Sequence, residues 1–160
     1  MNISREYIHT FDVVGEMLHL VNKYDIPIKL LELEITETTD SEGVSDVVQK
    51  MKDAGFTMLM DDFGSGYSSL NMLQKTQFDV LKIDRGFLSE FMESSRGRKI
   101  ISHTISMSRD IGLDIIAEGV ETPEQASFLS DCGCDSAQGF YYSKPITQEE
   151  FDKMLVEVNK

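Results

Sequence analysis

Polar and charged side chains recur where the short apolar runs of this 160-residue chain end. Carboxylates follow four of these runs, and a lysine and an amide join them. The set consists of Glu34, Asp61, Asp62, Lys82, Asp84, Glu118 and Gln138. Because carboxylates that are packed together repel one another, such a cluster needs cations to balance it. One lysine is too little for five acids, so the pattern predicts a site for hard divalent metal ions.

The apolar runs alternate with longer amphipathic segments, a pattern typical of repeated β-α units around a parallel sheet. The predicted strands are 29–36, 57–62, 80–84, 114–120 and 136–142, with a short stub at 2–4. The predicted helices are 13–24, 44–54, 67–75, 87–111 with a break near Gly97, 123–130 and 148–158. In a parallel barrel the carboxyl ends of the strands gather at one face, so the polar set would converge there.

Two of the predicted helices begin with capping residues. Thr147 stands three residues before Glu150, which is the spacing of a capping box. Thr122 is followed by Pro123 and then by Gln125, so proline would occupy the first helical position. Both patterns predict where these two helices start.

Composition narrows the classes of partner. With 28 Asp and Glu against 15 Lys and Arg, the formal net charge is −13, which argues against a nucleic-acid polymer, whose phosphates are held by Lys and Arg. No apolar run approaches the roughly 18 residues of a membrane span, so we expect no membrane contact by this chain. Cys132 and Cys134 are too close for an ordinary disulfide. We therefore expect reduced thiols and a cytoplasmic chain, whose parent protein can carry a membrane tether.

The number of β-α units limits the architecture. A complete eight-stranded barrel takes roughly 250 residues, whereas this chain offers five convincing strands and a stub. Two architectures fit this count: an open sheet, or a barrel whose front is missing.

The segment 61–70, Asp-Asp-Phe-Gly-Ser-Gly-Tyr-Ser-Ser-Leu, leaves a predicted strand, turns on two glycines and enters a helix. Its Asp-Phe-Gly triplet also occurs in protein kinases, but the chain has no phosphate loop upstream and no His-Arg-Asp loop. Its Gly-Ser-Gly lacks the third glycine of a dinucleotide fingerprint. Neither of these two motifs therefore accounts for the segment.

Together with its neighbours, the segment resembles the EAL domain, a bacterial phosphodiesterase family that hydrolyses cyclic di-GMP. Segment 61–70 matches the family's Asp-Asp-Phe-Gly-Thr-Gly-Tyr-Ser-Ser-Leu loop with only serine for threonine. The other matching segments follow in the family's order: Asn-Ile-Ser at 2–4, Leu-Glu-Ile-Thr-Glu at 33–37, Leu-Lys-Ile-Asp-Arg at 81–85, Ile-Ala-Glu-Gly-Val-Glu-Thr at 116–122, Gln-Gly-Phe at 138–140 and Lys-Pro at 144–145. The resemblance covers essentially the whole chain.

The resemblance implies a fold in the α/β class, a partial TIM-like (β/α) barrel of the EAL type. Residues 1–160 would be a single EAL domain, its C-terminal two-thirds. The Glu-Ala-Leu triplet that names the family does not occur in the sequence. The first strand, the first helix, that glutamate and a nearby phosphate-binding arginine would therefore be missing from this chain.

The resemblance also implies two divalent metal ions, Mg or Mn. One would lie among Asn2, Glu34, Asp61 and the missing glutamate, and the other among Asp61, Asp62 and Glu118. Asp61 would bridge the two. Two hard cations about 3.5 to 4 Å apart can activate water and stabilise both oxygens of an in-line displacement at phosphorus. Without this context, Asp61 and Asp62 could instead be an ordinary helix-start or turn pair.

Four further residues would act near the metals, and each has a structural alternative. Lys82 would orient the attacking water or meet a phosphate oxygen, or would form a salt bridge with Asp61 or Asp84. Asp84 would bind substrate, or would cap the helix that follows it. Glu121 would be a catalytic carboxylate beside the substrate, or an acid in the first turn of a helix. Gln138 would bond the water network or the phosphate, or would be satisfied by backbone groups.

The resemblance assigns Glu37 to anchoring the loop that follows Asp62. Gly64 and Gly66 would let this loop move and so couple metal occupancy to dimerisation. A barrel without its first unit also exposes strand edges, so we expect a homodimer or an element-swapped oligomer. His9, His19 and His103 match no family motif and are expected to be ordinary surface or core residues.

These inferences lead to two functional hypotheses. The first is hydrolysis of cyclic di-GMP to linear pGpG by the parent domain with two metal ions, this chain alone being inactive or weak. The second is a catalytically silent module that binds cyclic di-GMP or a protein partner in signalling. An unrelated metal-dependent barrel lyase is a remote third, because the Asp-Asp-Phe-Gly loop favours the EAL domain.

Overall fold

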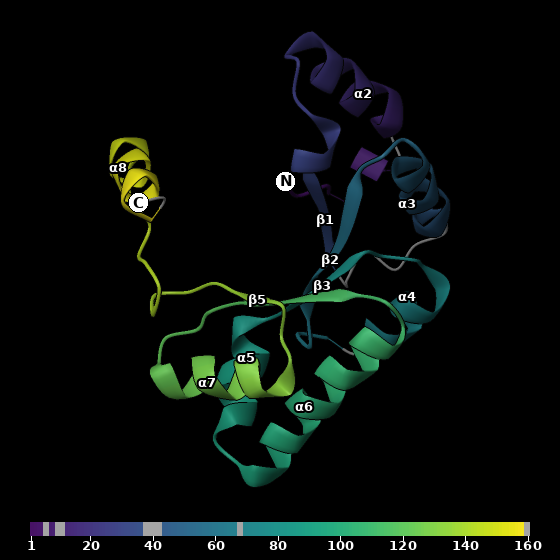
Figure 1. Ribbon diagram of the computed structural model, residues 1–160. Coiled ribbons are helices and arrows are strands. Elements are labelled where there is room, and N and C mark those ends of the chain that lie inside the picture. Colours follow the sequence, from purple (N-terminus) through teal and green to yellow (C-terminus); the bar gives the residue numbers. More distant parts are fainter. Residues whose placement is uncertain (5–6, 9–11, 37–42, 67–68, 159–160) are drawn as a thin grey trace.

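The computed structural model describes residues 1–160 except 5–6, 9–11, 37–42, 67–68 and 159–160. A parallel sheet of five strands is its centre, and the strands follow in chain order. They are β1 (Glu32–Thr36), β2 (Thr57–Phe63), β3 (Val80–Ile83), β4 (Asp114–Ala117) and β5 (Ser136–Ala137). Among the described residues the sheet does not close into a barrel, as expected for a partial barrel of this type (Figure 1).

The stub predicted at 2–4 is present as one parallel bridge between Asn2 and Glu34. The Ile3 amide donates to the Glu34 carbonyl at 2.8 Å, and the Glu34 amide donates to the Met1 carbonyl at 2.9 Å. The first residues therefore extend the sheet beyond β1.

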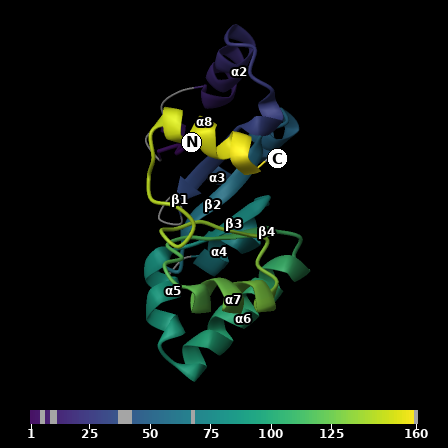
Figure 2. The ribbon, with the colours of Figure 1, turned by 60° about the vertical axis from the view of Figure 1, so that its left-hand side comes forward.

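Helices follow the strands in the alternating order that the apolar pattern predicts. They are α2 (Val13–Lys23), α3 (Val44–Asp53), α4 (Ser69–Lys75), α5 (Arg85–Met92), α6 (Ser95–Asp110), α7 (Pro123–Cys132) and α8 (Gln148–Val158), with a 3-10 turn η1 (Ile28–Leu30) before β1. Figure 2 shows α2 and α3 at one end of the molecule and α5, α6 and α7 at the other, and Figure 1 shows α8 set apart from both groups. Among the described helices, none has both the length and the apolar character to span a bilayer.

The core has two parts. One part packs α2 and α3 against β1 and β2, and its fully buried members include Leu33, Ile35, Met51 and Met58. The other packs α5, α6 and α7 against β3 and β4 and is centred on residues that are 0% exposed: Ile83, Leu88, Ile101, Ile105 and Ile115. Helices therefore cover one face of the sheet, and the other face begins with the buried residues Leu59 and Val80.

Four predicted boundaries differ from the structure for local reasons. Residues 29–30 belong to η1, which starts behind Pro27, and not to the first strand. The break predicted near Gly97 within the helical segment 87–111 lies instead at Ser94, whose hydroxyl accepts from the Gly97 amide at 2.9 Å and caps α6. The last two predicted strands end early, because the chain turns at Gly119, where φ is +66°, and at Gly139, where an added Cβ would lie 2.2 Å from the Val120 carbonyl oxygen.

The capping predictions are confirmed. The Thr122 hydroxyl and the Gln125 side chain exchange hydrogen bonds with each other's backbone at the start of α7. At the start of α8 the Thr147 amide donates to the Glu150 carboxylate at 2.8 Å.

Candidate functional site

The polar residues at the strand ends converge on one ammonium group. Lys82 Nζ lies 3.0 Å from Glu34 Oε1, 3.0 Å from Asp61 Oδ1 and 2.8 Å from Glu118 Oε1. These residues come from β1, β2, β3 and the end of β4, four neighbouring strands. We call Glu34, Asp61, Asp62 and Glu118, with Lys82, the acid cluster. The convergence predicted from the sequence is therefore present in the structure.

Strand alternation explains why these side chains share a face. Leu33 and Ile35 of β1 are 0% exposed and pack under the helices, so Glu34 between them faces the opposite side. Leu81 and Ile83 of β3 likewise pack into the two parts of the core, which turns Lys82 away from the helices. A charged residue between two buried apolar neighbours thus reaches the uncovered face of the sheet.

The charge of Lys82 is strongly favoured. Burial lowers the pKa of this ammonium, since the residue is only 7% exposed. Its hydrogen bonds to Glu118, Glu34 and Asp61 more than offset burial, so the pKa of Lys82 lies well above its ordinary value. The salt bridge to Asp61, one of the structural alternatives for Lys82, is thus present.

The surroundings of Asp62, in contrast, disfavour its charged form. Burial raises the pKa of this carboxyl, and the neighbouring charges of Asp61, Asp84 and Glu118 raise it further, against a lowering by Lys82. The neighbouring acids therefore create a negative potential at Asp62, which is the condition that attracts a further cation.

A β-bulge sits at the end of β2. Met60 pairs with Leu81 whereas Phe63 pairs with Ile83, so β2 contains one more residue than β3 over this stretch. Asp62 has a φ of +58°, in the left-handed region. Without the extra residue, alternation would place Phe63 on the face of Asp61. With it, Phe63 returns to the helix side, where its ring packs edge-on against Phe87 at 6.1 Å between centroids.

Gln138 and Glu121 occupy different places beside the cluster. The Gln138 amide donates to Glu118 Oε1 at 2.7 Å, so Gln138 joins the cluster through its side chain. Glu121 instead pairs with Arg85 at 2.7 Å, and both groups are exposed. A cavity of about 480 Å³ is lined by all four of these side chains, and Phe140 and Phe151 form part of its apolar wall.

Asp84 caps α5. One of its carboxylate oxygens accepts from the Gly86 amide at 2.7 Å and from the Phe87 amide at 3.1 Å. The structural alternative for Asp84 is thus realised. A role in substrate binding stays a prediction.

The predicted loop lies only in part within the described residues. Glu37 lies outside the described residues. Gly64 has a φ of +100°, and an added Cβ there would lie 2.4 Å from the Phe87 ring, so both backbone and space favour glycine at this position. The turn is closed by the Ser65 amide, which donates to the Asp62 carbonyl at 3.1 Å. Gly66, the second glycine of the predicted loop, lies two residues after Gly64.

The donor set suits hard divalent cations, because it consists of carboxylates with the amide of Asn2 next to Glu34 in the sheet. No group of three or more His, Cys, Asp or Glu residues in the described part of the chain is already arranged around a common metal position. Three of the acids turn to Lys82 instead. Cation binding therefore requires carboxylate oxygens to rotate away from the ammonium.

Arg85 was not among the residues that the sequence singled out. An added Cβ at Gly119 would lie 2.2 Å from Arg85 Cγ, so glycine lets the arginine stem pass close to the strand end and reach Glu121. The available signal was its place directly after Asp84, in a chain with few basic residues.

Comparison with known proteins gives a consistent result. The family profile described as "EAL domain" matches residues 1–145. The signaling protein YkoW of Bacillus subtilis is 34% identical over 98% of this chain and 20% of its own length. The cyclic di-GMP phosphodiesterase NbdA of Pseudomonas aeruginosa is 33% identical over 89% of this chain and 19% of its own length. The chain thus spans about a fifth of the curated relatives that it matches.

Solved structures agree with this result. The EAL domain of Mycobacterium smegmatis DcpA superposes with a TM-score of 0.89 at 34% identity, over 98% of this chain and 71% of that one. The PaMucR phosphodiesterase in complex with c-di-GMP gives 0.85 at 34% identity, over 94% and 62%. Klebsiella pneumoniae BlrP1, described as a manganese and cyclic di-GMP complex, gives 0.83 at 29% identity, over 91% and 38%.

Proposed function

The chain belongs to the EAL domain family, and we propose from this premise that its acid cluster serves two-metal hydrolysis of cyclic di-GMP to linear pGpG. Similarity to cyclic di-GMP phosphodiesterases supports the substrate. The match to 62–71% of two solved EAL chains supports residues 1–160 as the C-terminal two-thirds of one domain. The free thiols of Cys132 and Cys134 support a cytoplasmic location.

The observation that carries the proposal is the convergence of three carboxylates within 3.0 Å of Lys82 Nζ at the carboxyl ends of neighbouring strands. Asn2, Glu34 and Asp61 would hold one cation, and Asp61, Asp62 and Glu118 the other. Mg or Mn is the expected metal, and the manganese complex of a similar protein supports this choice. When bound, two such cations supply an activated water and stabilise the charge that develops on the phosphate.

The chain's own residues would position the substrate and move protons. Lys82 keeps its proton, so it donates hydrogen bonds and places positive charge where a phosphate oxygen or the attacking water would lie. Gln138, which bonds Glu118 at 2.7 Å, would orient the same network through its amide. Glu121 and Asp84 would act from the substrate side, at the cavity of about 480 Å³ and at the start of α5.

One observation favours the second hypothesis, a silent module that binds cyclic di-GMP or a protein partner. In the described residues Glu34, Asp61 and Glu118 pair with Lys82, and the acids form no ready metal position. Because residues 1–160 also contain no Glu-Ala-Leu triplet, we expect weak hydrolysis or none from this chain alone. The proposal includes a homodimer or an element-swapped oligomer, which the open sheet supports.

The test measures binding and hydrolysis of cyclic di-GMP with Mn²⁺, Mg²⁺ or EDTA, by calorimetry and by chromatography of the products. Binding that depends on the divalent cation and slow appearance of linear dinucleotide are expected. Asp61→Asn should weaken metal-dependent binding about tenfold or more, while the exposed control Glu149→Gln should not. Metal-dependent binding without product would favour the silent module. Absence of binding under all conditions would reject both hypotheses.

A further inference from the structure

An arginine outside the acid cluster lines the cavity of about 480 Å³. This cavity extends from Glu118 and Gly119, directly after β4, to Phe151 and Met154 of α8, and we call it the β4–α8 cavity. Its volume lies within the range of roughly 300–1,000 Å³ that is typical of small-molecule sites. Arg85 lies in its wall, and the metal-binding and proton-transfer roles proposed above do not use it.

The backbone determines the path of the Arg85 side chain. Arg85 is the first residue of α5 and follows the capping residue Asp84. Its stem passes so close to Gly119 that an added Cβ there would lie 2.2 Å from Arg85 Cγ and 2.8 Å from Arg85 Cδ. This path is therefore available because residue 119 is glycine. The guanidinium at the end of the stem remains exposed at the cavity.

Glu121 pairs with the guanidinium without using all of its donors. Arg85 Nη2 lies 2.7 Å from Glu121 Oε1, and the two side chains are 62% and 44% exposed. A guanidinium has five N–H donors in one plane, so a contact with one carboxylate oxygen leaves donors for a ligand. Because an exposed ion pair contributes little to stability, the guanidinium can turn toward a ligand with little loss of free energy.

This pairing makes a neutral acceptor a better partner for Arg85 than a phosphate. Glu121 offsets the positive charge of the guanidinium, and its own charge would repel a phosphate at close range. The edge of a guanine base is neutral and offers two acceptors, O6 and N7, which match two N–H groups of one arginine. Adenine carries an amino donor in place of O6, so the same arginine would face a donor.

We propose that Arg85 determines the base specificity of this domain by donating two hydrogen bonds to O6 and N7 of a guanine in the β4–α8 cavity. The inference rests on the proposed function, because the guanine is a base of cyclic di-GMP. Glu118 and Gln138, which are hydrogen-bonded at 2.7 Å, line this cavity and also belong to the surroundings of Lys82. A base in the cavity can therefore be joined to a phosphate at the acid cluster.

The wall of the β4–α8 cavity suits a flat ring. Phe140 and Phe151 contribute aromatic surface to it and are 55% and 49% exposed. Stacking on such a ring holds any base, because every base has an aromatic face. The wall thus supplies affinity for a base, and Arg85 supplies the choice between guanine and adenine.

The experiment compares 5′-GMP with 5′-AMP in EDTA by NMR titration of the protein. The two nucleotides have the same ribose and phosphate, so a difference in affinity comes from the base. GMP should bind about tenfold more tightly than AMP. 7-Deaza-GMP, which lacks only the N7 acceptor, should bind roughly threefold more weakly than GMP. Equal affinities for GMP and AMP would overturn the proposal.

Variants assign the preference to Arg85. Arg85→Ala should weaken GMP about tenfold and leave AMP unchanged. Arg85→Lys keeps the positive charge but lacks the planar fork, so most of the preference should be lost here as well. Arg98→Ala on α6 is the matched control, because the Arg98 side chain is also exposed and pairs with Glu124 at 2.6 Å. If Arg85→Ala weakened GMP and AMP equally, Arg85 would contact phosphate and the proposal would be wrong. Circular dichroism checks that each variant folds.

Cyclic di-GMP with Mn²⁺ separates this proposal from the proposed function. If GMP binding depends on Arg85 while cyclic di-GMP is neither bound with the metal nor hydrolysed, the guanine site stands and the proposed function fails. If cyclic di-GMP is bound or hydrolysed while the protein does not distinguish GMP from AMP, the proposed function stands and the role of Arg85 is wrong. Absence of GMP binding at millimolar concentration would also overturn the proposal.

Discussion

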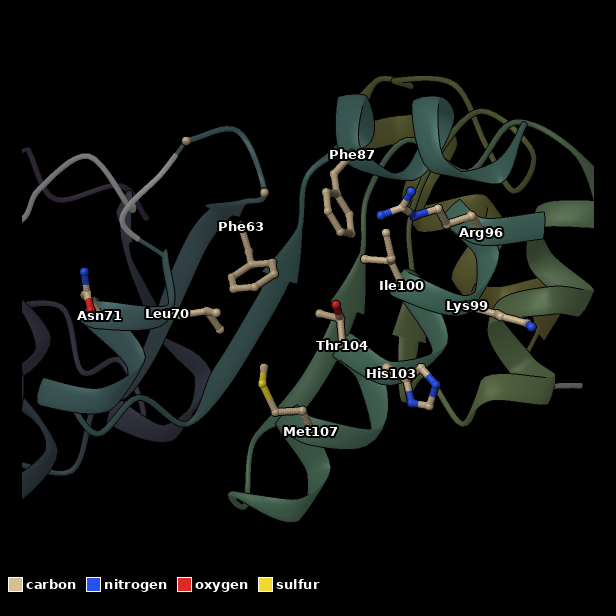
Figure 3. A pocket seen from close by; sticks show the side chains of 12 residues that line it. Phe63, Leu70, Asn71, Phe87, Arg96, Lys99, Ile100, His103, Thr104 and Met107 are labelled. Carbon is tan, nitrogen blue, oxygen red and sulfur yellow. The ribbon is translucent and has the colours of Figure 1, made fainter. Parts of the chain in front are cut away.

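The acid cluster and a cavity of about 940 Å³ between α4 and α6, the α4–α6 cavity (Figure 3), place lysine in opposite surroundings. Lys82 is 7% exposed and touches three carboxylates within 3.0 Å, whereas Lys99 is exposed and has no ion-pair partner in the described chain. The first region has more negative charge than its single cation balances, and the second has only basic charge around an apolar wall. One small domain can therefore place an acidic cluster and a basic, apolar-walled cavity on the two sides of a single strand end.

Removing a cation from each region gives the largest contrast. Lys82→Met leaves three carboxylates facing one another with little solvent, so we expect the free energy of unfolding to fall by about 3–5 kcal/mol. Lys99→Met should change it by no more than about 0.5 kcal/mol. Urea denaturation in EDTA measures both. Adding Mn²⁺ should restore more stability to Lys82→Met than to the wild type, and equal losses for the two variants would contradict the contrast.

Gly64 lies between the two regions and should affect both. Gly64→Ala forces a methyl group into a backbone with φ of +100° and to 2.4 Å from the Phe87 ring, so we expect a loss of about 2 kcal/mol. Gly43→Ala is the matched control, because its φ is +94° but no described atom lies within 4 Å of the added carbon. In thermal melts the melting temperature of Gly64→Ala should therefore be lower than that of Gly43→Ala. The reverse order would show that the Phe87 contact is unimportant.

Variants of Asp84 test whether this acid, directly after β3, only caps α5 or also binds a ligand. Asp84→Ala removes the cap of α5 and should cost about 1 kcal/mol of stability, whereas Asp84→Asn keeps an oxygen for the Gly86 and Phe87 amides and should stay near wild type. If Asp84 also binds substrate, Asp84→Asn should weaken cyclic di-GMP binding at unchanged stability. Unchanged binding would leave the cap as its whole role.

Replacing Asp62 should have the smallest effect on the free energy of unfolding. The sign of this effect follows from the raised pKa of Asp62. The folded protein holds the Asp62 proton more tightly than the unfolded chain does, so ionised Asp62 destabilises the fold near pH 7. This penalty fades as the pH falls through the raised pKa. In EDTA, Asp62→Asn should therefore raise the free energy of unfolding by about 0.5 kcal/mol at pH 7, and its advantage should shrink on acidification. Melts from pH 7 to pH 4 measure it.

Asp25 provides the control for Asp62→Asn. Asp25 also has a left-handed backbone, with φ of +51°, but it is exposed and far along the chain from the acids. Asp25→Asn therefore isolates the backbone preference of asparagine. A pH-dependent gain of the same size at Asp25 would show that charge crowding at Asp62 is not the cause.

The sequence predicts the acid cluster well because alternation and parallel order are strong physical constraints. Glu34, Asp61, Lys82 and Glu118 are separated by up to 84 positions, yet parallel strands bring their ends to one edge. The break between α5 and α6 was predicted three residues too late. Gly97 is needed for packing, since an added Cβ would lie 2.0 Å from the Phe91 carbonyl oxygen, but the cap at Ser94 sets where α6 begins.

The α4–α6 cavity was not predicted, because its wall is assembled from three helices and a strand end. A partial signal exists within α6, where Arg96, Ile100, His103 and Met107 follow one another at helical spacing. The β-bulge has no comparable signal. Asp61 and Asp62 form an ordinary pair of residues until the pairing with β3 is known.

The extra residue in β2 also has a consequence for how this domain can change through mutation. Deleting the codon of Asp62 would pair Met60, Asp61 and Phe63 one to one with Leu81, Lys82 and Ile83, so the aromatic ring and the first carboxylate would keep their present faces. Such a deletion would remove one carboxylate from the acid cluster and leave the helix side of the sheet intact. A one-residue insertion at this point is therefore a route by which a regular strand can gain a second acid without repacking its core.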